Sequence, residues 1–177
     1  MVYILLADGF EEIEALEPLD ILRRAEIPVK TAGVCGSRAT GAHGITVEAD
    51  ILIQDVQPED MSLLMLPGGP GHAKLDASQA VHRLLEDACS RGIYIASICA
   101  APSIPGKKGM LAGKRATCFP GYEEQLRGAE ITGEKVVLDG NMLTGKGAGA
   151  AAEFGFKIVE ILRDKETADR IRGMMQY

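Results

Sequence analysis

Short apolar segments alternate along this chain with longer amphipathic stretches. Segments rich in Ile, Leu and Val predict parallel strands at residues 2–6, 29–34, 63–66, 93–98 and 142–144. Amphipathic stretches predict helices at residues 11–25, 78–91, 150–163 and 165–174, with a further short helix directly after Cys99. This alternation is typical of a parallel sheet that helices cover on both faces, so we predict an α/β fold.

Two segments do not fit the alternation of strand and helix, and we interpret them as insertions. One is residues 46–53. The other pairs residues 135–138 with 142–144 around Asp139-Gly140-Asn141, where the turn-forming residues predict a hairpin.

The first predicted helix has two unusual features. Pro18 lies inside it and cannot donate to the carbonyl of Glu14, so we expect a kink near Glu14. Its apolar side chains also surround most of the helix instead of forming one stripe. We therefore expect it to be buried on two sides, by its own sheet and either by a second subunit or by other elements of the core.

Composition, net charge and the spacing of cysteines and histidines exclude several classes of function. The 177 residues are 46% hydrophobic and 25% charged, which predicts one globular domain over residues 1–177. A net charge of -6 argues against nucleic-acid and anionic-membrane partners. The apolar run at residues 2–7 is too short for a signal peptide or a membrane span. Four cysteines form no C-x-x-C pair and three histidines show no metal-motif spacing, so we expect a reduced, cytoplasmic protein without a metal.

Cys99 is the strongest candidate for a reactive residue. It follows the predicted strand at residues 93–98, and ligands of open α/β sheets gather at the carboxyl ends of strands. Ala100-Ala101-Pro102 suits the start of a helix, which would place the thiol at a nucleophile elbow. Amides and the helix dipole there favour thiolate. The spacing fits a buried core cysteine about equally well.

Two glycine-rich segments have different interpretations. Pro67-Gly68-Gly69-Pro70-Gly71 follows a predicted strand, and its amides could hold an oxyanion beside the thiol. Residues 145–150 match a dinucleotide fingerprint, but that motif needs a following strand and an acidic residue about twenty positions on to hold the ribose, and only helical sequence follows here. After the first strand, Ala7-Asp8-Gly9-Phe10 would repel a flavin phosphate, so we predict no cofactor.

Four motifs, taken together, resemble a known family. They are Glu11-Glu12-Ile13-Glu14-Ala15, Leu66-Pro67-Gly68-Gly69, Ala96-Ser97-Ile98-Cys99-Ala100-Ala101-Pro102, and Gly147-Ala148-Gly149 before Glu153-Phe154. In order and spacing, the chain resembles the DJ-one and ThiJ branch of the ThiJ/PfpI superfamily over essentially its whole length. The resemblance implies a flavodoxin-like sandwich, a homodimer, and a cysteine that oxidises readily to sulfinate.

The resemblance also implies roles for individual residues. In that family the glutamate that matches Glu14 is protonated, donates a hydrogen bond to the thiolate and lowers the thiol pKa. The positions of Gly68, Gly69 and Ala100 match backbone amide donors around the thiol. His43 is a candidate accessory residue, because it corresponds to a basic residue that approaches the partner subunit in some relatives.

Two departures from the family pattern limit the function. Phe119 stands where animal DJ-one proteins have a histidine implicated in acid–base chemistry, which predicts modest glyoxalase turnover. Ala100 stands where the PfpI peptidase branch has a histidine, so a peptidase is not expected. A glutamine amidotransferase would need a histidine after Cys99, and none follows His82.

Two functions therefore compete. In the first, the Cys99 thiolate attacks a small reactive carbonyl compound such as methylglyoxal, and Glu14 moves protons in a glyoxalase or deglycase type of reaction. In the second, Cys99 oxidises without catalysis, and the protein acts as an oxidative-stress sensor or chaperone. Both use the same residues.

Overall fold

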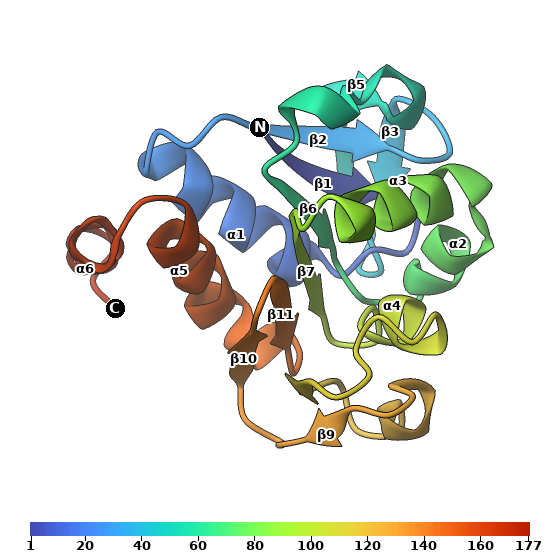
Figure 1. The fold of residues 1–177 in the computed structure, drawn as a ribbon. Helices are drawn as coiled ribbons and strands as arrows, with labels where there is room; N and C mark the ends of the chain where they lie inside the picture. The colour runs from blue at the N-terminus through green and yellow to red at the C-terminus, as the bar shows by residue number, and fades with distance from the viewer.

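A seven-stranded sheet forms the centre of the structure, a computed structural model that describes residues 1–177 (Figure 1). Its strands are β1 (Val2–Leu6), β2 (Val29–Gly33), β5 (Ile51–Leu52), β6 (Leu63–Leu66), β7 (Tyr94–Ile98), β10 (Val136–Asp139) and β11 (Met142–Gly145). Their order is β10-β11-β7-β6-β1-β2-β5. All neighbours are parallel except β10 and β11, which form the predicted hairpin.

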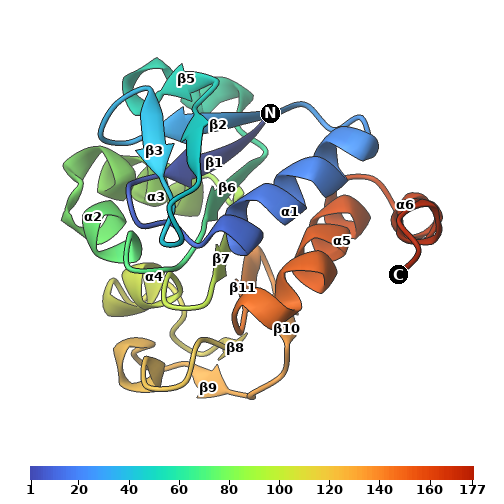
Figure 2. The same ribbon diagram turned by 180° about the vertical axis from the view of Figure 1, so that it is seen from behind.

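Helices cover both faces of this sheet (Figures 1 and 2). On one side lie α1 (Glu12–Arg24) and α5 (Ala151–Leu162), with α6 (Lys165–Met174) packed against α5, and on the other lie α2 (His72–Ala77), α3 (Gln79–Ser90) and α4 (Ser103–Lys107). The predicted flavodoxin-like sandwich is confirmed. No helix is long and apolar enough to cross a membrane.

Strand β1 shows how the sequence builds two cores from one sheet. Successive side chains of a strand point to opposite faces. Val2, Ile4 and Leu6 therefore pack in the core under α1 and α5, and Tyr3 and Leu5 pack in the core under α3. Because both faces of the central strands are buried, their sequences are continuous apolar runs.

Short elements complete the fold. They are the antiparallel pair β3 (Arg38–Thr40) and β4 (Thr46–Glu48), the parallel pair β8 (Arg115–Ala116) and β9 (Glu130–Ile131), and the 3-10 turns η1 (Ile53–Asp55), η2 (Pro58–Asp60), η3 (Glu123–Gln125) and η4 (Ala148–Ala150).

The interpretation of residues 46–53 as an insertion is wrong for part of the segment. Strand β4 lies in the small β3–β4 sheet, but β5 joins the main sheet parallel to β2. The Asp50 carboxylate accepts hydrogen bonds from the amide and the hydroxyl of Thr31, at 2.8 and 2.9 Å, and so fixes β5 beside β2. A strand of two residues is too short to produce a recognisable pattern.

Helix α1 runs without a break from Glu12 to Arg24, with Pro18 inside it. Its second side is covered by α5, because Gly155 allows the two helices to approach closely. A Cβ atom at Gly155 would lie only 3.1 Å from Cα of Pro18. The sequence predicted that either a second subunit or another core element covers the second side of this helix. Helix α5, a core element, covers most of it, whereas Ile13 remains 50% exposed.

Candidate active site

The backbone of Cys99 forms a sharp turn at the end of β7. Its φ angle is 64°, which a residue other than glycine seldom adopts. The Cys99 amide donates to the carbonyl of Gly145 at 2.8 Å, and the Cys99 carbonyl accepts from the amide of Phe119, also at 2.8 Å. The neighbouring segments thus hold the elbow in place. Helix α4 begins only at Ser103, so its dipole acts on the thiol less directly than the sequence suggested.

Glu14 lies beside this thiol and is completely buried. Its Oε2 atom accepts a hydrogen bond of 2.9 Å from the amide of Gly68. A Cβ atom at Gly68 would lie 2.6 Å both from Oε2 of Glu14 and from Cβ of Cys99, so only glycine fits between the two groups. The Gly68 amide therefore binds the carboxyl, whereas the resemblance implied a donor to the sulfur.

The second oxygen of Glu14 has no hydrogen-bond partner. Oε1 is buried like Oε2, but no donor of the protein reaches it. A buried carboxylate oxygen without a donor is unfavourable, whereas a protonated oxygen can itself donate to an acceptor nearby. The neighbouring sulfur of Cys99 is such an acceptor when it is ionised.

The two groups change each other's ionisation. Burial raises the pKa of Glu14 from its ordinary 4.5 to about 7, against the opposing effect of hydrogen bonds with Cys99 and Gly68. Burial, the charge of Glu14 and its hydrogen bond raise the pKa of the Cys99 thiol to about 12. Near neutral pH the pair therefore holds at most one negative charge. The expected lowering of the thiol pKa is not found while Glu14 is the charged member.

Backbone amides act on the sulfur in the opposite direction. Hydrogen bonds from Gly69 and Ala100 lower the pKa of Cys99. Gly69 has a φ angle of 77°, and a Cβ atom there would lie 2.6 Å from the amide nitrogen of Glu11 and from the carbonyl oxygen of Gly9. Because the glycine-rich turn packs closely on the end of β1, the amide of Gly69 points toward the thiol.

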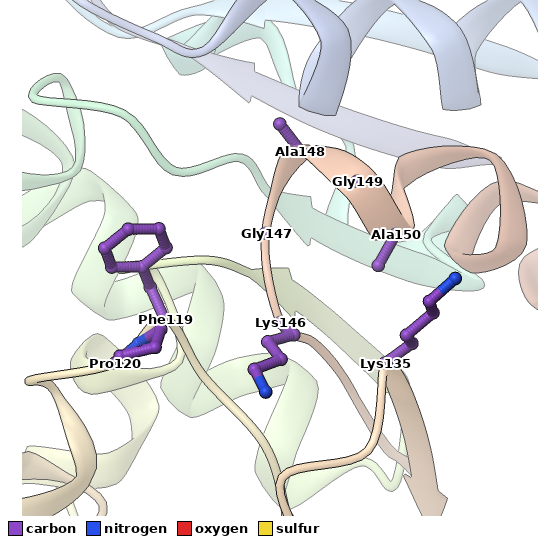
Figure 3. Close-up of a pocket in the computed structure, with 8 residues that line it drawn as sticks. All are labelled: Phe119, Pro120, Lys135, Lys146, Gly147, Ala148, Gly149 and Ala150. Atoms are coloured by element: carbon purple, nitrogen blue, oxygen red, sulfur yellow. The ribbon is translucent and has the colours of Figure 1, made fainter.

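The half-buried thiol borders a hollow of about 360 Å³. Its lining consists of Gly69, Pro70, His72, Cys99, Ala100, Phe119 and Tyr122. A second hollow of about 380 Å³ shares Phe119 with the first (Figure 3). Lys135, Lys146 and the turn at residues 147–150 line it, and Phe119 and Pro120 face them across the space. Phe119 is 49% exposed and forms the wall between the two hollows.

Two residues of the thiol hollow were not identified from the sequence. The His72 ring lies edge-on to the Tyr122 ring, with 5.3 Å between their centroids. His72 directly follows the glycine-rich turn, and this position was a usable signal. Tyr122 lies after β8 in a stretch without regular periodicity, so the sequence gave no comparable sign of it.

His43 does not reach the thiol. Its Nδ1 atom lies 2.9 Å from Oε2 of Glu12 and 3.6 Å from Glu11, and its side chain is 69% exposed. The hydrogen bond with Glu12 and the two carboxylate charges raise the pKa of His43. Glu11, Glu12 and His43 thus form a cluster of potential metal ligands that spacing in the sequence did not reveal. Glu12 and His43 already bind each other, so the cluster is explained without an ion.

The other cysteines lie in different surroundings. Cys35 and Cys89 are exposed, and Cys118 is buried. Burial, with a smaller effect from the charge of Glu123, raises the pKa of Cys118 to about 11. None of the three borders the hollow of Cys99.

The chain is similar to known proteins over nearly its whole length. A sequence profile of the DJ-1/PfpI family matches residues 1–161. A deglycase of Pyrococcus abyssi is 30% identical, with 92% of this chain and 99% of the deglycase covered. A glutathione-independent glyoxalase of Caenorhabditis elegans is 31% identical, with coverage of 95% and 91%. The crystal structure of Drosophila melanogaster DJ-1beta superposes with a TM-score of 0.93 at 35% identity, over 99% of this chain and 96% of that one.

Proposed function

The chain belongs to the DJ-1/PfpI family, and on that basis we propose that it removes small reactive carbonyl compounds under stress, with the Cys99 thiolate as nucleophile and Glu14 as its proton donor. Relatives that are named a deglycase and a glutathione-independent glyoxalase support this substrate class. The same names favour catalysis over the alternative of a non-enzymatic oxidation sensor.

The observation that carries the proposal is the completely buried Glu14 carboxyl, which shares a hydrogen bond with Cys99 and has one oxygen without a further partner. When it is protonated, Glu14 donates to the thiolate, while Oε2 accepts from Gly68. Amides of Gly69 and Ala100 supply further hydrogen bonds to the sulfur. In this arrangement every polar atom of the pair has a partner.

The first step balances with these two residues alone. The Cys99 sulfur forms a bond to the aldehyde carbon of an α-oxoaldehyde, and the electron pair of the C=O bond moves onto oxygen. Glu14 gives its proton to that oxygen, which leaves a hemithioacetal and a carboxylate. Amides of Gly69 and Ala100 stabilise the oxygen while it is charged.

Two further steps complete the turnover. Transfer of the hydrogen of the first carbon to the second converts the hemithioacetal into the thioester of a 2-hydroxy acid. Water then cleaves the thioester and releases the acid and the thiol. Overall, one water is added to the α-oxoaldehyde, and no external oxidant or reductant takes part.

The test is lactate formation from methylglyoxal by the purified protein and by a Cys99→Ser control. We expect lactate only with the native thiol. If the two preparations release equal amounts, and dilute peroxide adds two oxygen atoms at Cys99 alone, the enzymatic proposal fails and the oxidation sensor takes its place.

We also propose a cytoplasmic homodimer. All four cysteines are free thiols and two of them are exposed, which suits a reducing compartment. Ile13 and Ile45 are 50% and 54% exposed, and they lie on either side of the Glu12–His43 pair, where a second copy could cover them. Sedimentation velocity of the protein and of an Ile13→Asp variant tests this, because the variant should sediment as a monomer.

A further inference from the structure

His72 lies in the thiol hollow but has no part in the chemistry described above. Of the seven residues that line this hollow, only Cys99, His72 and Tyr122 have side chains that can exchange a proton. The others are glycine, alanine, proline and phenylalanine. Glu14 is completely buried and is not among the lining residues. A proton transfer on the substrate side of the hollow therefore has few available partners.

The hydrogen bonding of His72 defines which nitrogen is the base. Nδ1 lies 2.9 Å from the carbonyl oxygen of Gly69. A carbonyl oxygen can only accept, so Nδ1 carries the hydrogen, and in the neutral ring Nε2 keeps its lone pair. The edge-on contact with Tyr122 also holds the ring. His72 is thus an oriented imidazole with a free basic nitrogen, and its tautomer is set by a backbone carbonyl.

The proposed reaction requires such a base. Once Glu14 has given its proton to the oxygen of the hemithioacetal, the hydrogen on the first carbon must leave and a hydrogen must be added to the second. A substrate bound to the Cys99 sulfur would extend into the hollow that this sulfur and His72 both line. We propose that Nε2 of His72 is the base that takes the hydrogen from the first carbon and returns it to the second. This inference rests on the proposed function.

The step conserves atoms and electrons. As Nε2 takes the proton, the C–H electron pair forms a double bond between the two carbons, and the electron pair of the second carbon's C=O bond moves onto its oxygen. That oxygen then takes the proton of the hydroxyl group on the first carbon. The oxygen left on the first carbon re-forms a carbonyl, now that of the thioester, while the C=C electron pair takes the proton back from the imidazolium onto the second carbon. His72 ends as it began, and the thioester is ready for hydrolysis.

Matched variants separate a chemical role from a positioning role. In His72→Asn, the side-chain amide nitrogen takes the place of Nδ1 and can keep the hydrogen bond to Gly69, but no base remains. We expect kcat for lactate formation to fall about 100-fold, the usual contribution of a general base. Alkylation of Cys99 by iodoacetamide should stay within about twofold of the native rate, because the nucleophile is unaltered. His82→Asn is the control, because His82 lies outside both hollows.

Imidazole rescue supplies a second readout. Added imidazole should restore lactate formation at least tenfold in His72→Ala, and it should not stimulate the native protein. Native-like turnover of His72→Asn, or equal losses in His72→Asn and His72→Ala without rescue, would overturn the assignment. Absence of lactate from the native protein would instead refute the proposed function itself.

Discussion

Replacing Glu14 by glutamine tests which of two buried groups carries the negative charge. Glutamine has nearly the same shape, and its carbonyl oxygen can accept the Gly68 hydrogen bond that Oε2 accepts in the native chain. Its amide can point at the sulfur in place of Oε1. The variant therefore removes the ionisable proton and leaves the packing almost unchanged.

The expected result is a rise of about one unit in the pKa of Cys99. A carboxyl O–H that donates to a thiolate is a strong, charge-assisted hydrogen bond, and the less acidic amide makes a weaker one. Hydrogen bonds to charged groups contribute about 1.5–3 kcal/mol. Weakening one by about half corresponds to roughly 1.4 kcal/mol, which is about one pKa unit.

The assay is the rate of iodoacetamide alkylation as a function of pH, followed by mass spectrometry of the peptide that contains Cys99. This readout excludes the exposed thiols of Cys35 and Cys89. Asp20→Asn is the matched control, because it removes a carboxylate from the exposed side of the same helix. Its alkylation profile should overlay that of the native protein.

A fall in the thiol pKa would refute the reasoning. If the native charge lies on the Glu14 carboxylate, that charge and its hydrogen bond are the main effects after burial that raise the pKa of Cys99 to about 12. Glutamine would remove the charge, and the thiol would then ionise at a lower pH. The sign of the shift thus distinguishes a neutral acid that donates to sulfur from a carboxylate that repels its ionisation.

Three further results are expected. Burial raises the pKa of Glu14 from 4.5 to about 7, so the folded chain binds this proton more tightly than the unfolded chain does. Were Glu14 to ionise, the free energy of unfolding would fall by about 3 kcal/mol as pH rises through that interval. Because the proposed Glu14 keeps its proton beside the thiolate, we expect urea titrations to show no such fall relative to Glu14→Gln. Gly68→Ala should abolish lactate formation and destabilise the fold by about 1–3 kcal/mol, whereas Gly149→Ala, with free space around it, should leave both unchanged. Glu12→Gln should loosen the loop that Glu12 binds through the amide and ring of His43, seen as faster hydrogen exchange there.

The sheet could be predicted from sequence because its central strands are buried on both faces. Apolar runs at residues 2–6 and 63–66 match β1 and β6 to the residue. Strand β5 could not be predicted, because two residues are too few to show an alternation of apolar and polar positions. Its position in the sheet depends on the contact between Asp50 and Thr31, which lie 19 positions apart in the sequence. Patterns along the chain report local burial, and pairings between distant polar side chains leave no such pattern.

The candidate site was predictable in its parts but not in its contacts. Position at a strand end pointed to Cys99, and the resemblance pointed to Glu14. Neither could reveal that the Gly68 amide binds the carboxyl, because this depends on how closely the glycine-rich turn approaches helix α1, where a Cβ atom at Gly68 would not fit. His72 has no metal-motif spacing and precedes Cys99 in the sequence, so neither of these patterns marks it as a site residue. Its placement follows from how the glycine-rich turn folds onto the end of β1.

Two features next to Cys99 lower the stability of the fold, and this supports a functional role for the residue. A residue other than glycine in the left-handed region costs on the order of 1–3 kcal/mol. Ionising Glu14 in this site would cost about 3 kcal/mol more than in water, which is what its raised pKa expresses. Domains of this size are stable by only about 5–15 kcal/mol. Cys118 is also buried, yet its backbone is unstrained and no carboxyl is buried against it. A cysteine that served only to fill the core would need neither feature, so their coincidence at Cys99 is best explained by the chemistry of its sulfur.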